Sequence, residues 1–334
     1  MPPSAMTETE ITDLPPLKPN ERSLLEMHSV LNIFNVLRGE LGLIGLTLAN
    51  DPDLLVQALA ICDGLITSLH DASTALATAR DTDHHVHALQ AEVEAALAAH
   101  PALGDHPEIK ESLANLGSVY AILRTRAREQ LARAQAPDRW LDFSAVALER
   151  EFHAAFAAIE RNSHGRYRIL YNAALQAPPD YYFDLKIEGN PGDQVRMPAV
   201  FQDVMRDLIA NARKYTPPGG HITAALHESA ELLRFVVEDT GRGIPPGELT
   251  RVFEFGRRAS NVGDVRTMGG GFGLTKAFFV TKQFGGRFWI GSQLGVGTRI
   301  RIHLPLPRAP LSSDSSSETT SRSAAAPLPV ARSA

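Results

Sequence analysis

The sequence predicts a protein of two parts, an N-terminal helical bundle followed by an α+β domain of the α/β-sandwich kind. Residues 21–135 are rich in alanine and leucine and contain few strand-forming residues. Residues 140–307 instead alternate strand-like apolar runs with helical stretches, and they contain two glycine clusters. The composition changes across residues 136–139, which we interpret as a linker between the two parts.

Length, charge and cysteine content restrict the class of protein. The 334 residues are enough for two cores, and the net charge of −5 gives no indication of nucleic acid as a partner. The single cysteine, Cys62, excludes an intramolecular disulfide and fits a reducing compartment. No apolar run approaches the roughly 20 residues of a membrane helix, and residues 1–20 lack the regions of a signal peptide. We therefore expect a soluble, cytoplasmic protein without a membrane span, in which residues 1–20 are a flexible leader.

The helical part is expected to begin with one long helix over residues 21–49. Its apolar residues recur in steps of three, four and seven, which is typical of the seam of a bundle or coiled coil. They are Leu24, Met27, Leu31, Phe34, Leu41, Ile44 and Leu48. Asn50-Asp51-Pro52-Asp53 ends this helix, and further helices are expected near 54–79, 83–99 and 107–135.

The second part is expected to form a mostly antiparallel sheet covered by helices on one face. One helix is expected over 144–162, and another starts at Met197-Pro198, with proline in its first turn, and continues to about Lys214. Strand-like runs are found at 167–171, 181–187, 221–227, 232–238, 287–292 and 298–304. Serine, alanine and proline dominate the last stretch, which predicts a disordered tail over 308–334.

Two glycine clusters follow one another in this second part. Asp239-Thr240-Gly241-Arg242-Gly243 comes after the apolar strand 232–238. There the carboxylate can accept a hydrogen bond from an exocyclic amine, and the glycines let the backbone approach a flat ligand. Gly269-Gly270-Gly271-Phe272-Gly273-Leu274 opens the helical run 274–284, so free backbone N–H groups can face phosphates. The two clusters in this order predict a nucleotide pocket.

The helix upstream of the clusters carries three polar residues on one face. Asp207, Asn211 and Lys214 are spaced four and three residues apart. An asparagine oxygen can help to hold Mg²⁺, and a lysine at the same end can reach phosphate oxygens. An amphipathic helix with a solvated polar side explains the same pattern, but the downstream glycine clusters favour a nucleotide site.

Four ordered segments resemble the ATP-site boxes of bacterial sensor histidine kinases. Their ATP-binding domain belongs to the GHKL superfamily, together with type II topoisomerases, mismatch-repair ATPases and heat-shock chaperone ATPases. The segments are Asn211-Ala212-Arg213-Lys214-Tyr215-Thr216, Asp239-x-Gly241-x-Gly243, Val252-Phe253-Glu254-Phe255-Gly256-Arg257-Arg258 and Gly269-x-Gly271-Phe272-Gly273-Leu274. The resemblance covers residues 140–307 and implies a catalytic domain that binds ATP and Mg²⁺. It also implies that residues 256–268 form a mobile lid over ATP.

The resemblance implies a role for individual residues. Asp239 would bind the adenine amino group and Asn211 would coordinate Mg²⁺. Lys214 and Arg258 would approach the phosphates, and Tyr215 would line the pocket. The other implied contacts with the nucleotide are Gly241, Gly243, Gly269, Gly271, Phe272, Gly273 and Leu274.

Asp207 departs from the resemblance, because histidine kinases usually have asparagine there. A carboxylate at this place is more like the hydrolytic relatives and the anti-sigma serine kinases, in which an acid activates water or a hydroxyl. Three interpretations of Asp207 stay open: a general base, a second metal contact, or a surface acid without a role.

The first helix carries a polar stripe beside its apolar seam, formed by His28, Asn32, Asn35 and Gly39. This stretch resembles the phosphoacceptor box of histidine kinases. The resemblance implies that His28 accepts a phosphoryl group, since an uncharged imidazole nitrogen can attack phosphorus near neutral pH. It also implies that Asn32 is placed for the reverse, phosphatase-type reaction.

The box departs from the family at three places. Ser29 stands where the family has the acid that orients or deprotonates the histidine. Leu31 replaces a basic residue, and Ile33 replaces a proline. Losing a general base could cost on the order of 10²–10⁴ in rate.

The expected assembly is a homodimer, since two helical hairpins from two chains would form a four-helix bundle. About 85 residues separate the first helix from the linker. Either the hairpin carries an insertion, or the helical part is a different domain.

The resemblance thus implies a soluble histidine kinase of a two-component system. MgATP would phosphorylate His28, and a response-regulator aspartate would accept the phosphoryl group. The signal would come from a sensory partner protein or act directly on the bundle. Two alternatives are a degenerate kinase that acts as a non-enzymatic nucleotide-binding regulator or scaffold, and a serine kinase or ATPase of the same superfamily.

Overall fold

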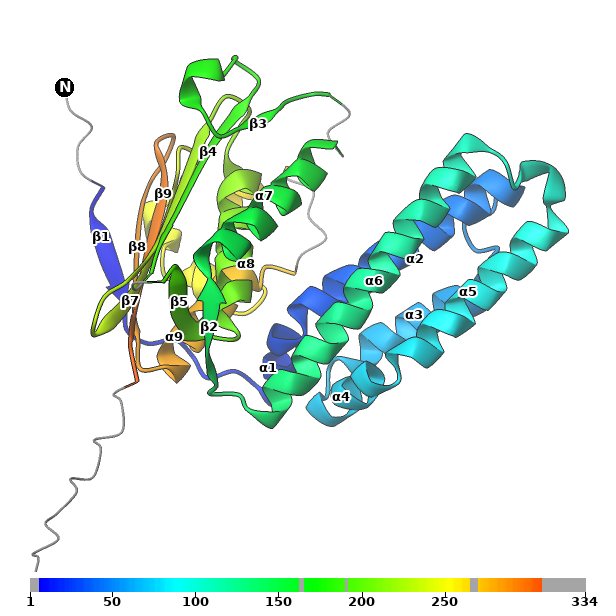
Figure 1. Ribbon diagram of the computed structural model, residues 1–334, viewed down its shortest axis with the longest axis horizontal. Coiled ribbons are helices and arrows are strands. Elements are labelled where there is room, and N and C mark those ends of the chain that lie inside the picture. Colours follow the sequence, from blue (N-terminus) through cyan, green and yellow to red (C-terminus); the bar gives the residue numbers. More distant parts are fainter. Residues whose placement is uncertain (1–5, 162–164, 190–191, 265–269, 308–334) are drawn as a thin grey trace, which may run out of the picture.

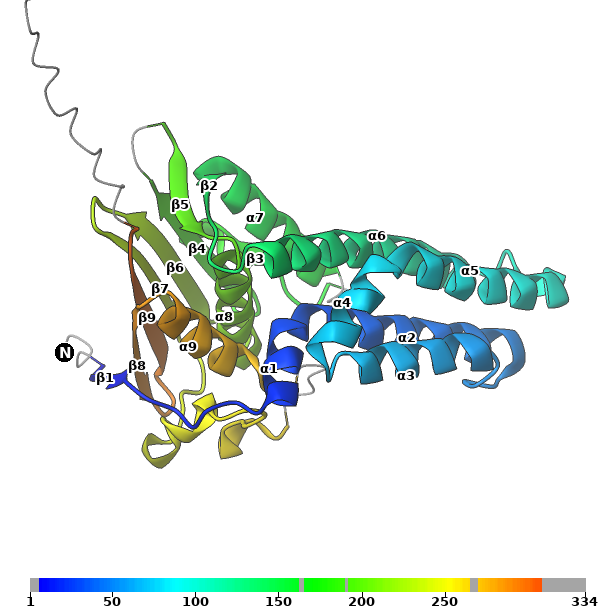
Figure 2. The same ribbon diagram turned by 90° about the horizontal axis from the view of Figure 1, so that it is seen from below.

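A computed structural model of the protein describes residues 6–161, 165–189, 192–264 and 270–307. A helical domain packs by one end against a domain built on a mixed sheet (Figures 1 and 2). The helices of the first domain are α1 (Pro19–Glu26), α2 (His28–Ala49), α3 (Val56–Ser68), α4 (Ala72–Arg80), α5 (Thr82–Ala99) and α6 (Pro107–Gln135).

The single helix predicted over 21–49 is in fact two helices, and that prediction is wrong at Met27. The backbone of Met27 lies at φ −93° and ψ 7°, outside the helical range, and its N–H still donates to Ser23 O. The Ser23 hydroxyl donates to Leu69 O at 2.7 Å, and α1 also contacts α9 (Gly273–Gln283) of the other domain. These tertiary contacts turn α1 away from the axis of α2, so His28 lies at the start of a helix.

Helices α2 and α6 form an antiparallel hairpin, and α3, α4 and α5 are inserted between them. Asn115 Nδ2 donates to Glu40 near the far end, whereas Gln130 Nε2 donates to the Glu26 carbonyl near the sheet domain. Residues from α2, α3, α5 and α6 share one core, among them Leu37, Leu41, Cys62, Leu89 and Leu116. A bundle of four helices is therefore completed within one chain. The homodimer stays a prediction.

Helix α2 has the length and apolar composition of a membrane span, although no such segment is expected from the sequence. It contains 22 residues, and its mean hydropathy reaches 1.2 over an 18-residue window. Core helices of soluble proteins pass the same test, and Leu37, Leu41 and Ile44 of α2 are completely buried in the bundle. A cytoplasmic location stays a prediction.

The second domain contains a seven-stranded sheet in the order β1-β8-β9-β7-β6-β4-β3. Strands β3, β4 and β6 are parallel neighbours, and every other neighbouring pair is antiparallel. The strands are β1 (Glu8–Ile11), β3 (Ile169–Leu170), β4 (Tyr181–Glu188), β6 (His221–Glu228), β7 (Leu232–Asp239), β8 (Arg287–Gln293) and β9 (Gly297–Pro305).

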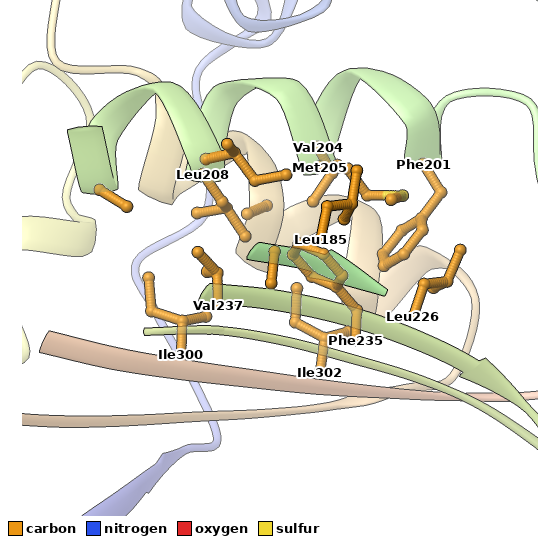
Figure 3. Close-up of a cluster of buried hydrophobic side chains, with 14 of the residues drawn as sticks. Leu185, Phe201, Val204, Met205, Leu208, Leu226, Phe235, Val237, Ile300 and Ile302 are labelled. Atoms are coloured by element: carbon orange, nitrogen blue, oxygen red, sulfur yellow. The ribbon is translucent and has the colours of Figure 1, made fainter. Parts of the chain in front are cut away.

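Helices α7 (Ala145–Arg161), α8 (Phe201–Tyr215) and α9 (Gly273–Gln283) cover one face of this sheet (Figure 1). Leu208 and Phe201 of α8 point toward Val237 and Phe235 of β7 in the core (Figure 3). Because every second residue of β7 is buried, its side chains alternate between this core and the opposite face.

A short two-stranded sheet was not expected from the sequence. Strand β2 (Trp140–Ser144) pairs with β5 (Gln194–Pro198), and Met197 lies opposite Leu141. Met197 and Pro198 therefore complete a strand, and α8 starts at Phe201 rather than at the predicted proline. Pro198 is tolerated because β5 is an edge strand of this two-stranded sheet.

Residues 8–11 form strand β1, so the prediction of a flexible leader is wrong for them. The strand pairs antiparallel with β8 at the edge of the sheet, and Ile11 is buried. Glu10 forms a bidentate ion pair with Arg287, and Glu8 contacts Arg301. The leader thereby ties the beginning of the chain to the last strands. The predicted tail over 308–334 lies outside the described residues.

Candidate active site

A cavity of about 360 Å³ lies between α8, the end of β7, the start of α9 and the beginning of α2. It brings together most residues that the sequence predicts as a site. Those that line it are His28, Asn32, Asp207, Asn211, Lys214, Tyr215, Asp239, Gly243, Arg258, Gly271, Phe272, Gly273 and Leu274. Gly241 lies outside the lining, behind Asp239, and Gly269 is not among the described residues.

Asp239 lies at the inner end of the cavity, where β7 ends. Its Oδ1 accepts a hydrogen bond from Gly241 N at 2.8 Å and a longer one from Thr298 N at 3.3 Å. Burial raises the pKa of Asp239 to about 7, although both hydrogen bonds act to lower it. The neighbouring wall is apolar and includes Ile244 and Ile300. A flat ring with a polar edge fits this arrangement of one carboxyl group among apolar side chains.

Two glycines are required by close backbone packing around the cavity. Gly243 has φ +67°, and a Cβ there would lie 2.1 Å from Gln293 O. Gly271 has φ +78°, and a Cβ there would lie 2.9 Å from Arg257 O. Any other residue would therefore push the loops away from the cavity.

Lys214 and Arg258 both line the cavity. Lys214 comes from α8, and Arg258 comes from the loop between the 3₁₀ turns Arg251–Phe253 and Ser260–Val262. Burial, together with the charge of Arg258, lowers the pKa of Lys214 to about 8. Two cations this close repel one another, so a polyanion between them would be stabilised by both. Phosphate groups meet that description.

The first part of the predicted lid is folded against the β7 loop. Arg242 forms a bidentate ion pair with Asp264 at 2.6 and 3.0 Å, and Asn261 Nδ2 donates to Gly243 O at 2.9 Å. Residues 265–268 lie outside the described part of the chain. Lid motion stays a prediction.

His28 closes the cavity from the helical domain and is 7% exposed. Its Nδ1 lies 3.7 Å from Asp207 Oδ2, and its Nε2 lies 3.2 Å from Asn32 Nδ2. The Phe272 ring meets the imidazole edge to face, with 5.5 Å between ring centroids. The histidine of the first domain and the pocket of the second thus meet within one chain.

A buried ion cluster that the sequence did not reveal holds the two domains together beside the cavity. Asp203 of α8 is 3% exposed and contacts Arg126 and Arg133 of α6. It also contacts Arg206 at 2.9 Å and Lys276 Nζ at 3.5 Å. Lys276 reaches Asp207 Oδ2 as well, at 3.3 Å. Only the spacing of Asp203 and Arg206, three residues apart on one helix, could have been recognised as a pair in the sequence.

Comparison with known proteins finds a family match and similar sensory kinases. Residues 198–308 match the family described as histidine kinase-, DNA gyrase B-, and HSP90-like ATPase. The adaptive-response sensory kinase SasA of Synechococcus elongatus is 37% identical over 125 residues, which are 35% of this chain and 31% of that protein. The sensor histidine kinase WalK of Bacillus subtilis is 38% identical over 104 residues, which are 30% of this chain and 17% of that protein. The chain thus spans less than a third of the length of these relatives.

Among solved structures, the catalytic domain of the histidine kinase ThkA has a TM-score of 0.36 at 19% identity. That match covers 50% of this chain and 95% of the ThkA chain. The family match at residues 198–308 includes Asn211, Asp239 and Gly271 of the cavity. Residues 198–308 thus match the ATPase family that histidine kinases share with DNA gyrase B and HSP90, and both relatives described above are sensory or sensor histidine kinases.

Proposed function

We propose that the protein is a histidine kinase of a two-component system. It binds MgATP in the cavity, transfers the γ-phosphoryl group to His28, and passes that group to an aspartate of a response regulator. One observation carries this proposal: His28 lines the same cavity as Asn211, Lys214 and Asp239 of its own chain. We further propose that the transfer occurs within one chain.

Different cavity residues contact different parts of the nucleotide. Asp239 accepts the adenine amine at the inner end, and Lys214 and Arg258 bind the phosphates nearer to the helical domain. Backbone N–H groups at the start of α9, after Gly271, face the same phosphates. Catalysis then consists mostly of positioning and charge neutralisation, as in other phosphoryl transfers.

Asn211 is the residue that would hold Mg²⁺. Within the described residues, no group of three or more histidine, cysteine or acidic side chains could hold a metal by itself. This fits Mg²⁺, which is usually bound by one or two protein oxygens together with substrate phosphates. When bound, the ion would neutralise charge on the β- and γ-phosphates.

The partners follow from the same proposal. A response regulator accepts the phosphoryl group, and a sensory partner protein or a ligand of the bundle provides the signal. The homodimer expected from the sequence remains part of the proposal. Exposed apolar residues on the outer side of α2 and α6 are available for it, namely Leu43, Leu46 and Ile122.

The adenine contact predicts a nucleotide preference that depends on pH. The 6-amino group of ATP donates to the Asp239 carboxylate, whereas the 6-oxo group of ITP accepts from the protonated acid. Because the pKa of Asp239 is raised to about 7, the ratio of ATP affinity to ITP affinity should rise about tenfold per pH unit between pH 6 and 8. Titration of the phosphates cancels in this ratio, since both nucleotides carry the same triphosphate. Equilibrium binding with the two Mg-nucleotides measures it, and in Asp239→Asn the ratio should not change with pH.

Incubation with γ-labelled ATP tests the proposed function itself. We expect the purified chain to acquire a label that is lost in acid and stable in alkali, as a phosphoramidate is, and to transfer it to the cognate receiver domain. An acid-stable label would indicate a serine kinase instead. Bound ATP without any label would indicate the non-enzymatic regulator.

A further inference from the structure

The phosphoacceptor box of this chain lacks an acid beside the histidine. Ser29 follows His28, and its hydroxyl is buried without a hydrogen-bond partner in the described structure. It therefore neither orients the imidazole nor balances charge on it. Some other group must do so if His28 is to react at the rate of a kinase with a complete box.

Asp207 presents a carboxylate to His28 from the other domain. Its Oδ2 lies 3.7 Å from His28 Nδ1, and neither atom forms a hydrogen bond of normal length with a described residue, although Lys276 forms an ion pair with the same Oδ2. The separation is slightly longer than the 2.7–3.2 Å of a typical hydrogen bond, and contacts of this kind tighten when substrate binds. Phe272, packed on the imidazole edge, restricts the ring beside this contact.

The surroundings keep Asp207 ionised and argue against its use as a metal contact. Burial acts to raise the pKa of Asp207, but the charge of Lys276 and the hydrogen bond from His28 outweigh it, and the pKa is lowered. Lys276 Nζ lies 3.3 Å from the same Oδ2 that faces His28. An ammonium group at that distance would repel Mg²⁺, so this oxygen is suited to a hydrogen bond with Nδ1.

We propose that Asp207 is the positioning residue that replaces the missing acid of the phosphoacceptor box. By accepting the Nδ1 proton in a hydrogen bond, it holds the tautomer in which Nε2 carries the lone pair. The Asn32 amide, 3.2 Å from Nε2, donates to that lone pair in this tautomer and must release it before attack. This proposal rests on the proposed kinase function.

The chemical step is balanced without a further reactant. The Nε2 lone pair forms a bond to the γ-phosphorus while the bond from that phosphorus to the bridging oxygen breaks. ADP leaves with the electron pair of that bond. The ring becomes positive, and its Nδ1–H remains hydrogen-bonded to the Asp207 carboxylate, which stabilises the charge.

Because Asp207 belongs to the other domain, it can orient His28 only when the two domains are packed together. His28 belongs to α2 and Asp207 to α8, so the two meet only when the helical domain is packed on the ATP-binding domain as described. An acid next to the histidine in the sequence would accompany it in every domain arrangement. Here the histidine is prepared for reaction only in the packed arrangement.

A rescue experiment tests the inference. In Asp207→Asn the phosphorylation rate at saturating ATP should fall by about 10²-fold, with ATP affinity within about twofold of the parent. Adding Ser29→Glu to this variant should raise its phosphorylation rate at least about tenfold, because the new carboxylate replaces the acid that the box lacks. Asp184→Asn, which removes a carboxylate of β4 outside the cavity lining, should behave like the parent. A parental rate in Asp207→Asn, or a loss of rate explained by weaker ATP binding, would overturn the proposal.

A second measurement does not depend on kinase activity. The ¹⁵N spectrum of histidine-labelled protein should show His28 protonated at Nδ1 in the parent, and a mixture of tautomers in Asp207→Ala. If the parent binds ATP but never acquires label, the proposed kinase function is wrong. The ¹⁵N spectrum still shows in that case whether Asp207 accepts the Nδ1 proton of His28. An Nε2-protonated His28 in the parent would refute the role of Asp207.

Discussion

His28→Ala is expected to abolish acid-labile phosphorylation completely while ATP remains bound. Of the described residues that line the cavity, His28 is the one histidine, so no other imidazole can take its place at the phosphates. The proposed nucleotide contacts come mostly from α8, β7 and the start of α9, which do not require the His28 side chain. Labelling with γ-labelled ATP, with ATP affinity measured on the same samples, checks both parts. His85→Ala, a change on α5 outside the cavity lining, should label like the parent.

The same variant shows whether transfer occurs within one chain. A mixture of His28→Ala with Asn211→Ala contains one intact pocket and one intact histidine on separate chains. Transfer within a chain predicts that neither protein becomes labelled in the mixture. If the Asn211→Ala chain acquires label at a substantial fraction of the parental rate, the transfer occurs between chains.

The ATP-binding region could be predicted from the sequence because its determinants are local. Asp239 with Gly241 and Gly243 follows a strand, and the glycines near 271 open a helix. The close approaches at Gly243 and Gly271 show why these positions carry glycine. Short-range patterns of this kind depend little on the tertiary context, and most of the predicted residues line one cavity.

Other features were not predictable because they depend on contacts between distant segments. Strand β1 exists because β8, near the other end of the chain, offers a sheet edge to a short segment with one apolar residue, Ile11. The helix break at Met27 follows from the packing of α1 on α4 and α9, against a local pattern that favours one continuous helix. The contact of His28 with Asp207 needed the arrangement of both domains.

Asp203→Ala is expected to destabilise the folded chain by about 3–5 kcal/mol, the usual effect of removing one partner from a buried charge cluster. Burial disfavours the Asp203 carboxylate, but the charges of Lys276 and Arg133 hold its pKa far below the usual range. A lowered pKa means that this stabilisation is fully present at neutral pH and is lost only as the pH falls well below the pKa of an unfolded aspartate, about 3.9. Without Asp203, four cations would lie close together, namely Arg126, Arg133, Arg206 and Lys276. Asp207, Glu129 and Glu151 would still offset part of their charge.

Urea unfolding followed by circular dichroism measures this change, and Glu129→Gln provides the matched control. Glu129 contacts the same arginines, Arg126 and Arg133, but it is 32% exposed and should contribute within about 1 kcal/mol. A stability of Asp203→Ala within 1 kcal/mol of the parent would contradict a stabilising cluster. Because Arg126 and Arg133 belong to α6 and Asp203 to α8, loss of the cluster also weakens the packing that brings His28 to Asp207. Asp203→Ala should therefore label more slowly than Glu129→Gln even at temperatures where both remain folded.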